Sequence, residues 1–131
     1  MPTVNIKNNC MMKTILIAED NDSNYMLMTY IVRRSYNYVR AANGREAVER
    51  VAQGGIDLVL MDINMPVMNG LEATRIIKEQ HPELPVVAVT ANAFETDLHL
   101  TLQAGCDGFL IKPVNSAQCL DTIAQLLGEK K

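Results

Sequence analysis

Cysteine is scarce in this sequence, and the few cysteines lack the spacing of a structural framework. Three occur in 131 residues, at Cys10, Cys106 and Cys119. Their number is odd and no C-x-x-C pair is present, which argues against a disulfide framework and against a zinc knuckle. We therefore expect reduced thiols, as in a cytoplasmic protein, with Cys106 and Cys119 acting as small apolar fillers.

Long apolar segments and basic clusters are also missing. The longest apolar runs, such as residues 58–61 and 86–89, are far shorter than the ~20 residues that cross a bilayer. Twelve basic residues stand against 15 acidic ones, giving a net charge of −3, and the largest basic cluster is Arg33-Arg34. We expect neither a membrane association nor direct binding of nucleic acid.

The chain has enough apolar material for one compact domain. Hydrophobic residues make up 48% and charged residues 21% of the sequence. A chain of this length buries roughly two-thirds of its unfolded surface. Residues 1–12 are polar, rich in asparagine and aperiodic, so we predict a disordered leader or linker there and a folded domain over residues 13–131.

Short apolar runs alternate with segments of helical periodicity after the leader. Strands are predicted at residues 14–18, 38–41, 58–62, 86–90 and 108–111. Helices are predicted at about 23–35, at 44–53, at about 70–80, around Phe94, Leu98 and Leu102, and along a final segment lined by Leu120, Ile123, Ala124 and Leu127. This alternation is typical of a parallel sheet with helices on both faces.

Details within these segments refine the prediction. Residues 38–41 are short and more polar, which favours an edge strand, whereas residues 58–62 should form a central strand. Asn21 or Asp22 can cap the first helix and Asn43 the second, whose apolar face we assign to Ala47, Val48, Val51 and Ala52. We predict an α/β fold, a flavodoxin-like doubly wound (βα)5 with a five-stranded parallel sheet in the order 2-1-3-4-5.

Polar residues stand at the carboxyl ends of the predicted strands: Glu19, Asp20, Asp62, Thr90 and Lys112. Parallel strands bring these ends to one edge, where open α/β sheets bind ligands. Two carboxylates ~4 Å apart repel by about 4 kcal/mol at an effective dielectric near 20, so three together need a cation or a proton. Oxygen ligands without histidine or cysteine favour Mg2+, which commonly shares its coordination with a phosphate.

This set of residues predicts chemistry on a phosphoryl group. Asp62 is the best candidate nucleophile, since a carboxylate can attack phosphorus to give an aspartyl phosphate. Lys112 would place a positive charge on phosphoryl oxygens, and the Thr90 hydroxyl would donate a hydrogen bond to one. The bond between Lys112 and Pro113 is a candidate for the cis isomer, with the trans isomer equally compatible with the local sequence.

The chain resembles the receiver domains of two-component response regulators. The motifs that carry the resemblance are residues 15–21 (ILIAEDN), 61–70 (MDINMPVMNG), 89–91 (VTA) and 108–113 (GFLIKP). The resemblance implies that Asp62 accepts phosphate from the phosphohistidine of a histidine kinase or a histidine phosphotransfer domain. It also implies that Glu19, Asp20, Asp62 and the Asn64 backbone carbonyl hold Mg2+, with Glu19 at a position where many members have aspartate.

The resemblance further implies a conformational switch and an output surface. Thr90 and Phe109 would form the switch, and the fourth helix, fifth strand and fifth helix would form the face for an effector or output partner. We expect a signalling module that catalyses only its own aspartyl phosphorylation and dephosphorylation, either alone or as part of a hybrid histidine kinase. The alternative is a Mg2+-dependent phosphatase with an aspartate nucleophile, similar to haloacid dehalogenases. Such enzymes have a second aspartate two residues after the nucleophile, where this chain has Asn64.

Overall fold

The computed structural model of the chain describes residues 12–63, 65, 67–91 and 95–128, with only the backbone at 95–98. Within these residues, strands and helices alternate in the order β1 (Thr14–Ala18), α2 (Asp22–Val32), β2 (Asn37–Ala41), α3 (Gly44–Ala52), β3 (Leu58–Asp62), α4 (Gly70–Gln80), β4 (Val86–Thr90), α5 (Glu95–Ala104), β5 (Gly108–Ile111) and α6 (Ser116–Leu127). All the strand pairs are parallel, and the sheet order is β2-β1-β3-β4-β5. The predicted fold class and strand order are confirmed.

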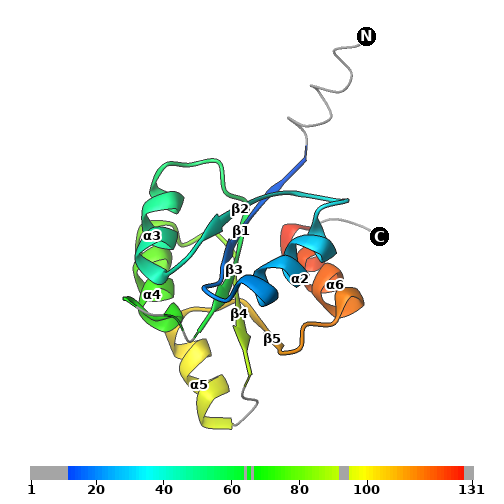
Figure 1. Ribbon diagram of the computed structural model, residues 1–131. Helices are drawn as coiled ribbons and strands as arrows, with labels where there is room; N and C mark the ends of the chain where they lie inside the picture. The colour runs from blue at the N-terminus through cyan, green and yellow to red at the C-terminus, as the bar shows by residue number, and fades with distance from the viewer. Residues whose placement is uncertain (1–11, 64, 66, 92–94, 129–131) are drawn as a thin grey trace.

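The sheet separates two apolar cores. Helices α2 and α6 cover one face, and α3, α4 and α5 cover the other (Figure 1). Successive residues of a strand point to opposite faces, so Ile15 and Ile17 enter the core under α2 and α6, whereas Leu16 and Ala18 enter the core under α3 and α4. Strands β3 and β4 are buried along their whole length, and β2 lies at an edge of the sheet, as predicted.

Asparagine residues cap the amino ends of several helices that follow the carboxyl edge of the sheet. Among the described helices, those that begin after Asn21, Asn43, Asn69 and Asn115 each have this side chain accept a hydrogen bond of 2.9 Å from the backbone N–H three residues later. Asn43 was predicted as a cap and Asn21 was one of two candidates beside Asp22, whereas the caps at Asn69 and Asn115 were not predicted. These caps fix where the loops at the carboxyl ends of the strands stop.

Two local predictions were wrong. Helix α2 ends at Val32 instead of Ser35, because Tyr36 is buried and the chain turns through hydrogen bonds from Ser35 and Tyr36 to the Val32 carbonyl. Ala52 is exposed, since it is the last residue of α3 and follows Val51, which already faces the core. The helix predicted around Leu102 is present as α5, where Leu102 itself is 61% exposed and Thr101 and Ala104 are buried.

Other predictions fall outside the described residues or need no change. Residues 1–11 of the predicted leader (residues 1–12), which include Cys10, are not described, and neither are Phe94 and the Leu98 side chain, so these stay predictions. Burial raises the pKa of the thiols of Cys106 and Cys119 to about 11, which keeps them protonated as apolar fillers. In the described part of the chain, no helix combines the length and the apolar character that crossing a bilayer requires.

Candidate metal and phosphoacceptor site

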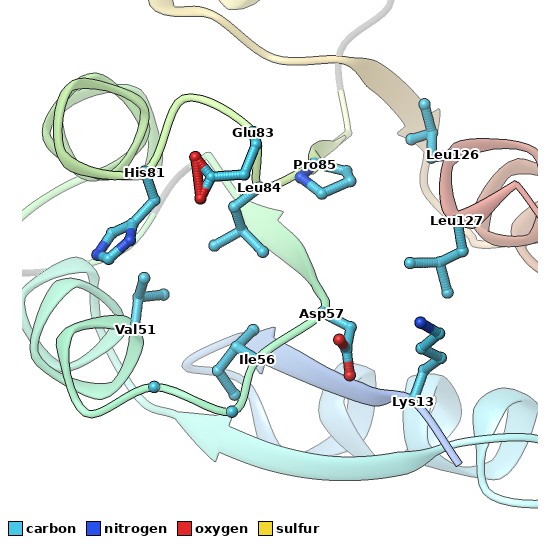
Figure 2. A pocket seen from close by; sticks show the side chains of 12 residues that line it. Lys13, Val51, Ile56, Asp57, His81, Glu83, Leu84, Pro85, Leu126 and Leu127 are labelled. Atoms are coloured by element: carbon cyan, nitrogen blue, oxygen red, sulfur yellow. The ribbon is translucent and has the colours of Figure 1, made fainter. Parts of the chain in front are cut away.

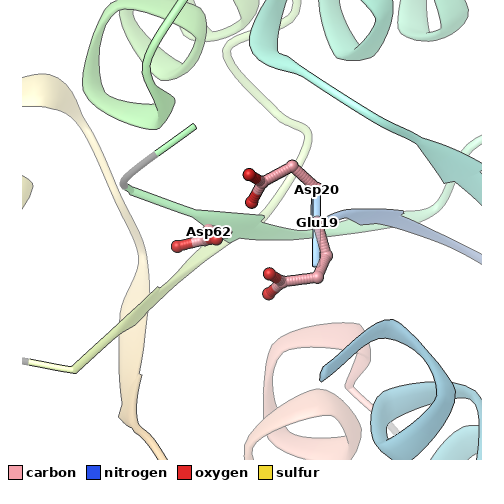
Figure 3. A group of neighbouring side chains, drawn as sticks. All are labelled: Glu19, Asp20 and Asp62. Atoms are coloured by element: carbon pink, nitrogen blue, oxygen red, sulfur yellow. The ribbon is translucent and has the colours of Figure 1, made fainter. Parts of the chain in front are cut away.

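Three carboxylates meet at the carboxyl edge of the sheet. Glu19 and Asp20 directly follow β1, and Asp62 is the last residue of the neighbouring strand β3. The parallel register pairs Ala18 with Met61, so the strands end side by side. One carboxylate oxygen from each of the three residues lies within 4.8 Å of the others (Figure 3). The convergence expected from the strand order is therefore present in the structure.

The burial of this cluster makes its negative charge costly. Glu19 is fully buried and Asp62 is 3% exposed, whereas Asp20 is exposed to solvent. Glu19 Oε2 accepts a hydrogen bond of 3.3 Å from the Asn21 backbone N–H, but Oε1 has no hydrogen bond in the described structure. A buried carboxylate oxygen without a hydrogen bond is expensive unless a cation satisfies it.

Lys112 supplies part of the missing positive charge. Its Nζ lies 3.3 Å from Glu19 Oε1 and 3.4 Å from Asp62 Oδ2, and its side chain is 20% exposed. The residue follows β5, its backbone N–H donates to the Thr90 carbonyl at 2.8 Å, and the Lys112–Pro113 peptide bond is cis. One ammonium therefore faces three carboxyl groups at this edge of the sheet.

The donor set fits a hard divalent cation. Mg2+ prefers oxygen ligands and retains several waters, which the exposed Asp20 side of the cluster admits. Glu19, Asp20 and Asp62 would hold such an ion, and Glu19 Oε1, which accepts no hydrogen bond from the described residues and has Lys112 Nζ 3.3 Å away, is a candidate ligand atom. Asn64, whose backbone carbonyl was predicted as a further ligand, lies outside the described residues.

Thr90 and Phe109 lie on the two strands beyond β3. Thr90 ends β4 and is 2% exposed, so its side chain is enclosed at the same edge as Asp62. Phe109 is on β5, where it pairs with Ala88, and is 39% exposed. The coupling between Thr90 and Phe109 stays a prediction.

Two glycines hold the loop after Asp62 against the end of the sheet, and neither was predicted from the sequence to take part in the site. A Cβ on Gly70 would lie 2.2 Å from the Asp62 carbonyl oxygen, and one on Gly44 would lie 2.2 Å from the Met68 carbonyl oxygen. Both backbone N–H groups donate here, Gly70 to the Ile63 carbonyl at 2.8 Å and Gly44 to the Met68 carbonyl at 3.0 Å. For Gly70, the sequence signal was its position at the end of the M-P-x-M-N-G motif.

A cavity of about 420 Å3 lies at the opposite, amino edge of the sheet (Figure 2). Its lining includes Lys13, Asp57 and Pro85, which immediately precede β1, β3 and β4, together with His81. Asp57 already accepts a hydrogen bond of 2.8 Å from the Thr14 backbone N–H. The cavity is therefore separate from the carboxylate cluster, and His81 takes no part in that cluster.

Replacing Asp20 with asparagine should have opposite effects on metal binding and on stability. Asp20 faces solvent, so Asp20→Asn removes repulsion from Glu19 and Asp62 worth about 1 kcal/mol at the dielectric of water and at low salt. We expect the metal-free domain to gain about that much unfolding free energy, while its Mg2+ affinity falls about tenfold. Urea unfolding and a Mg2+ titration followed by NMR measure the two effects.

Glu79→Gln, which removes an exposed carboxylate from α4, is the control for the Asp20 experiment and should leave Mg2+ affinity unchanged. An unchanged affinity in Asp20→Asn would remove Asp20 from the metal site.

The fold and the cluster together define a class of protein. A doubly wound parallel sheet with an acidic triad, a threonine and a lysine at its carboxyl edge is the arrangement of a receiver domain. Residues 15–124 match the family described as the response regulator receiver domain. The chain belongs to this family.

Similar proteins of known name agree with this assignment. The polar-differentiation response regulator DivK of Brucella anthropi is 36% identical over 91% of this chain and 99% of its own length. The receiver domain of the sensor histidine kinase PA1611 from Pseudomonas aeruginosa, solved with magnesium in its active-site cleft, is 33% identical, with a TM-score of 0.84 over 90% of this chain and 99% of that one.

A third similar structure includes a partner. It is the Saccharomyces cerevisiae co-crystal of the histidine phosphotransfer protein Ypd1 with the receiver domain of the response regulator Ssk1, and its matching chain is 30% identical with a TM-score of 0.82, covering 88% of each chain.

Proposed function

We propose that this receiver domain accepts a phosphoryl group from a phosphohistidine onto Asp62 and thereby controls an output partner. The observation that carries the proposal is the position of the buried Asp62 carboxylate, within 4.8 Å of the oxygens of Glu19 and Asp20 and 3.4 Å from Lys112 Nζ. A nucleophilic carboxylate, an oxygen set suited to a cation and a fixed ammonium are the parts that phosphoryl transfer needs.

The residues of the site divide the reaction between them. An Asp62 carboxylate oxygen forms the new P–O bond while the P–N bond of the phosphohistidine breaks, and the leaving imidazole keeps the electron pair of that bond. Lys112 balances charge on the phosphoryl oxygens, and the enclosed Thr90 hydroxyl donates to one of them. A bound Mg2+, held by Glu19, Asp20 and Asp62, would neutralise further charge on those oxygens. In this proposal the chain catalyses only its own phosphorylation and dephosphorylation.

Exposed apolar side chains lie on both sides of the site. Met26, Leu27 and Tyr30 are exposed on α2, which begins two residues after Asp20, while Leu100, Leu102 and Phe109 are exposed on α5 and β5. We assign the phosphohistidine donor to a histidine kinase or phosphotransfer domain, supported by the Ypd1–Ssk1 complex, and the output partner to the α5, β5 and α6 face. We propose a cytoplasmic domain that acts either alone or as part of a hybrid histidine kinase.

Phosphorylation by a small donor tests the proposal. Acetyl phosphate with Mg2+ should add one phosphoryl group to the domain, and a chelator should suppress the reaction. Intact-mass measurement detects the adduct, and hydroxylamine should remove it because acyl phosphates react with this nucleophile. No adduct in the presence of Mg2+ would contradict the proposal, and steady hydrolysis of nitrophenyl phosphate would instead support the phosphatase alternative, which the comparisons do not favour.

A further inference from the structure

Arg40 links the edge strand β2 to the acidic loop after β1. It lies opposite Ile17 in the β1–β2 register, one residue before Ala41, whose carbonyl accepts the Glu19 backbone N–H at 3.0 Å. The Arg40 guanidinium donates to the Glu19 carbonyl from Nε at 3.2 Å and from Nη2 at 3.0 Å. Nη2 also lies 3.4 Å from the Asp20 carbonyl oxygen. The side chain therefore holds the backbone of two of the three residues in the carboxylate cluster.

The same guanidinium contacts the first turns of α2. Nη2 lies 2.9 Å from Asp22 Oδ1, and the guanidinium carbon lies 4.4 Å from the centre of the Tyr25 ring. Burial raises the pKa of Tyr25, Tyr38 raises it further, and the charge of Arg40 acts in the opposite direction. The Asp22 side chain is 84% exposed, so this ion pair contributes little by itself. The ring and the two carbonyls define the position of the guanidinium.

We propose that Arg40 is a positioning residue for the cation site, fixing the Glu19–Asp20 backbone so that both carboxylates reach the place where Asp62 ends β3. The inference rests on the proposed function, because it assumes that this cluster binds Mg2+. A planar guanidinium can donate to one carbonyl through two nitrogens and stack on a ring at the same time, whereas a lysine ammonium cannot reproduce this geometry. Contacts of this kind around metal ligands commonly change affinity by tenfold or more.

The charge of Arg40 and its positioning role predict opposite effects of its loss on Mg2+ affinity. As a nearby positive charge, Arg40 repels a cation, so loss of the charge alone would tighten Mg2+ binding. As a positioning residue, Arg40 favours the cation, so loss of its geometry weakens binding even where the charge is kept. The sign of the change in affinity therefore separates the two roles.

The test is a Mg2+ titration of the unphosphorylated domain, followed by the backbone amide NMR signals of Glu19, Asp20 and Asp62. Arg40→Lys keeps the positive charge but loses the paired Nε and Nη2 hydrogen bonds to the Glu19 carbonyl, and we expect its Mg2+ affinity to fall about tenfold. Arg40→Met removes both the charge and these hydrogen bonds. Its Mg2+ affinity should also fall, but by less than in Arg40→Lys, because the repulsion between the guanidinium and Mg2+ is lost as well. Arg50→Lys is the matched control. Arg50 also donates to a backbone carbonyl, that of Gly54 at 3.0 Å, but Gly54 lies just past the carboxyl end of α3 and is not part of the carboxylate cluster. Its affinity should equal that of the unmodified protein.

The outcomes are distinct. Unchanged affinity in Arg40→Lys, or tighter binding in Arg40→Met, overturns the positioning role. Circular dichroism checks that the variants fold. If both Arg40 variants unfold, Tyr25→Leu is the deciding variant, because removing the ring under the guanidinium should weaken Mg2+ binding. An unchanged Mg2+ affinity in Tyr25→Leu would contradict the inference. If the unmodified protein binds no Mg2+, the metal site of the proposed function fails; if it binds Mg2+ and is phosphorylated while the variants match it, only the role of Arg40 fails.

Discussion

Asp62→Asn is expected to reduce phosphoryl incorporation from acetyl phosphate to the background level. An amide oxygen does not act as the nucleophile that a carboxylate provides, and the substitution also removes one anion from the cation site. The variant should still fold, because asparagine has nearly the same shape and the adjacent strands β1 and β4 keep their register with β3. Intact-mass measurement after incubation with Mg2+ and acetyl phosphate gives the result.

Asp57→Asn is the matched control for the phosphoacceptor assignment. Asp57 immediately precedes the amino end of the strand that Asp62 ends, and its carboxylate accepts the Thr14 backbone N–H, a bond that asparagine can also accept. This variant should be phosphorylated like the unmodified protein. Retention of a hydroxylamine-sensitive adduct in Asp62→Asn at the unmodified rate would place the phosphoacceptor elsewhere.

Gly70→Ala should destabilise the domain by about 3 kcal/mol, the upper part of the range for overpacked interiors. The added Cβ would lie 2.2 Å from the Asp62 carbonyl oxygen and 2.8 Å from the Ile63 Cα, and backbone atoms cannot move aside as a flexible side chain can. Relief of the clash has to displace the loop or the first turn of α4, which begins at Gly70. Urea unfolding measures the loss, and phosphorylation of the folded fraction should slow because the backbone of Asp62 shifts.

Gly108→Ala provides the comparison for the steric argument. A Cβ at Gly108 would meet side-chain atoms of Thr122 and Leu126 at 3.6 and 3.8 Å, which is ordinary contact, so we expect a change in unfolding free energy within about 0.5 kcal/mol. Equal losses in the two variants would show that a general effect of glycine replacement, and not the approach of Gly70 to Asp62, determines the stability.

The pattern of apolar residues was enough to predict the type and order of the elements. The apolar run at residues 58–62 predicted a central strand, and the structure buries every residue of β3. Helix faces were harder to predict: Leu102 shares the four-residue spacing of Phe94 and Leu98, yet it is 61% exposed. Spacing identifies a helix, but the face that it buries depends on how the helix is rotated against the sheet, which is a tertiary property.

The sequence by itself determined the parallel sheet and the residue types at its carboxyl edge, because strand ends follow from local apolar runs and parallel pairing brings those ends together. Only the tertiary structure decided which atoms meet. Whether Lys112 reaches both Glu19 and Asp62, and whether Arg40 on a neighbouring strand reaches the Glu19 carbonyl, depends on side-chain length, register and twist acting together. The close approach of Gly70 to Asp62 was decided in the same way, since steric contact between distant residues exists only after the loops have packed.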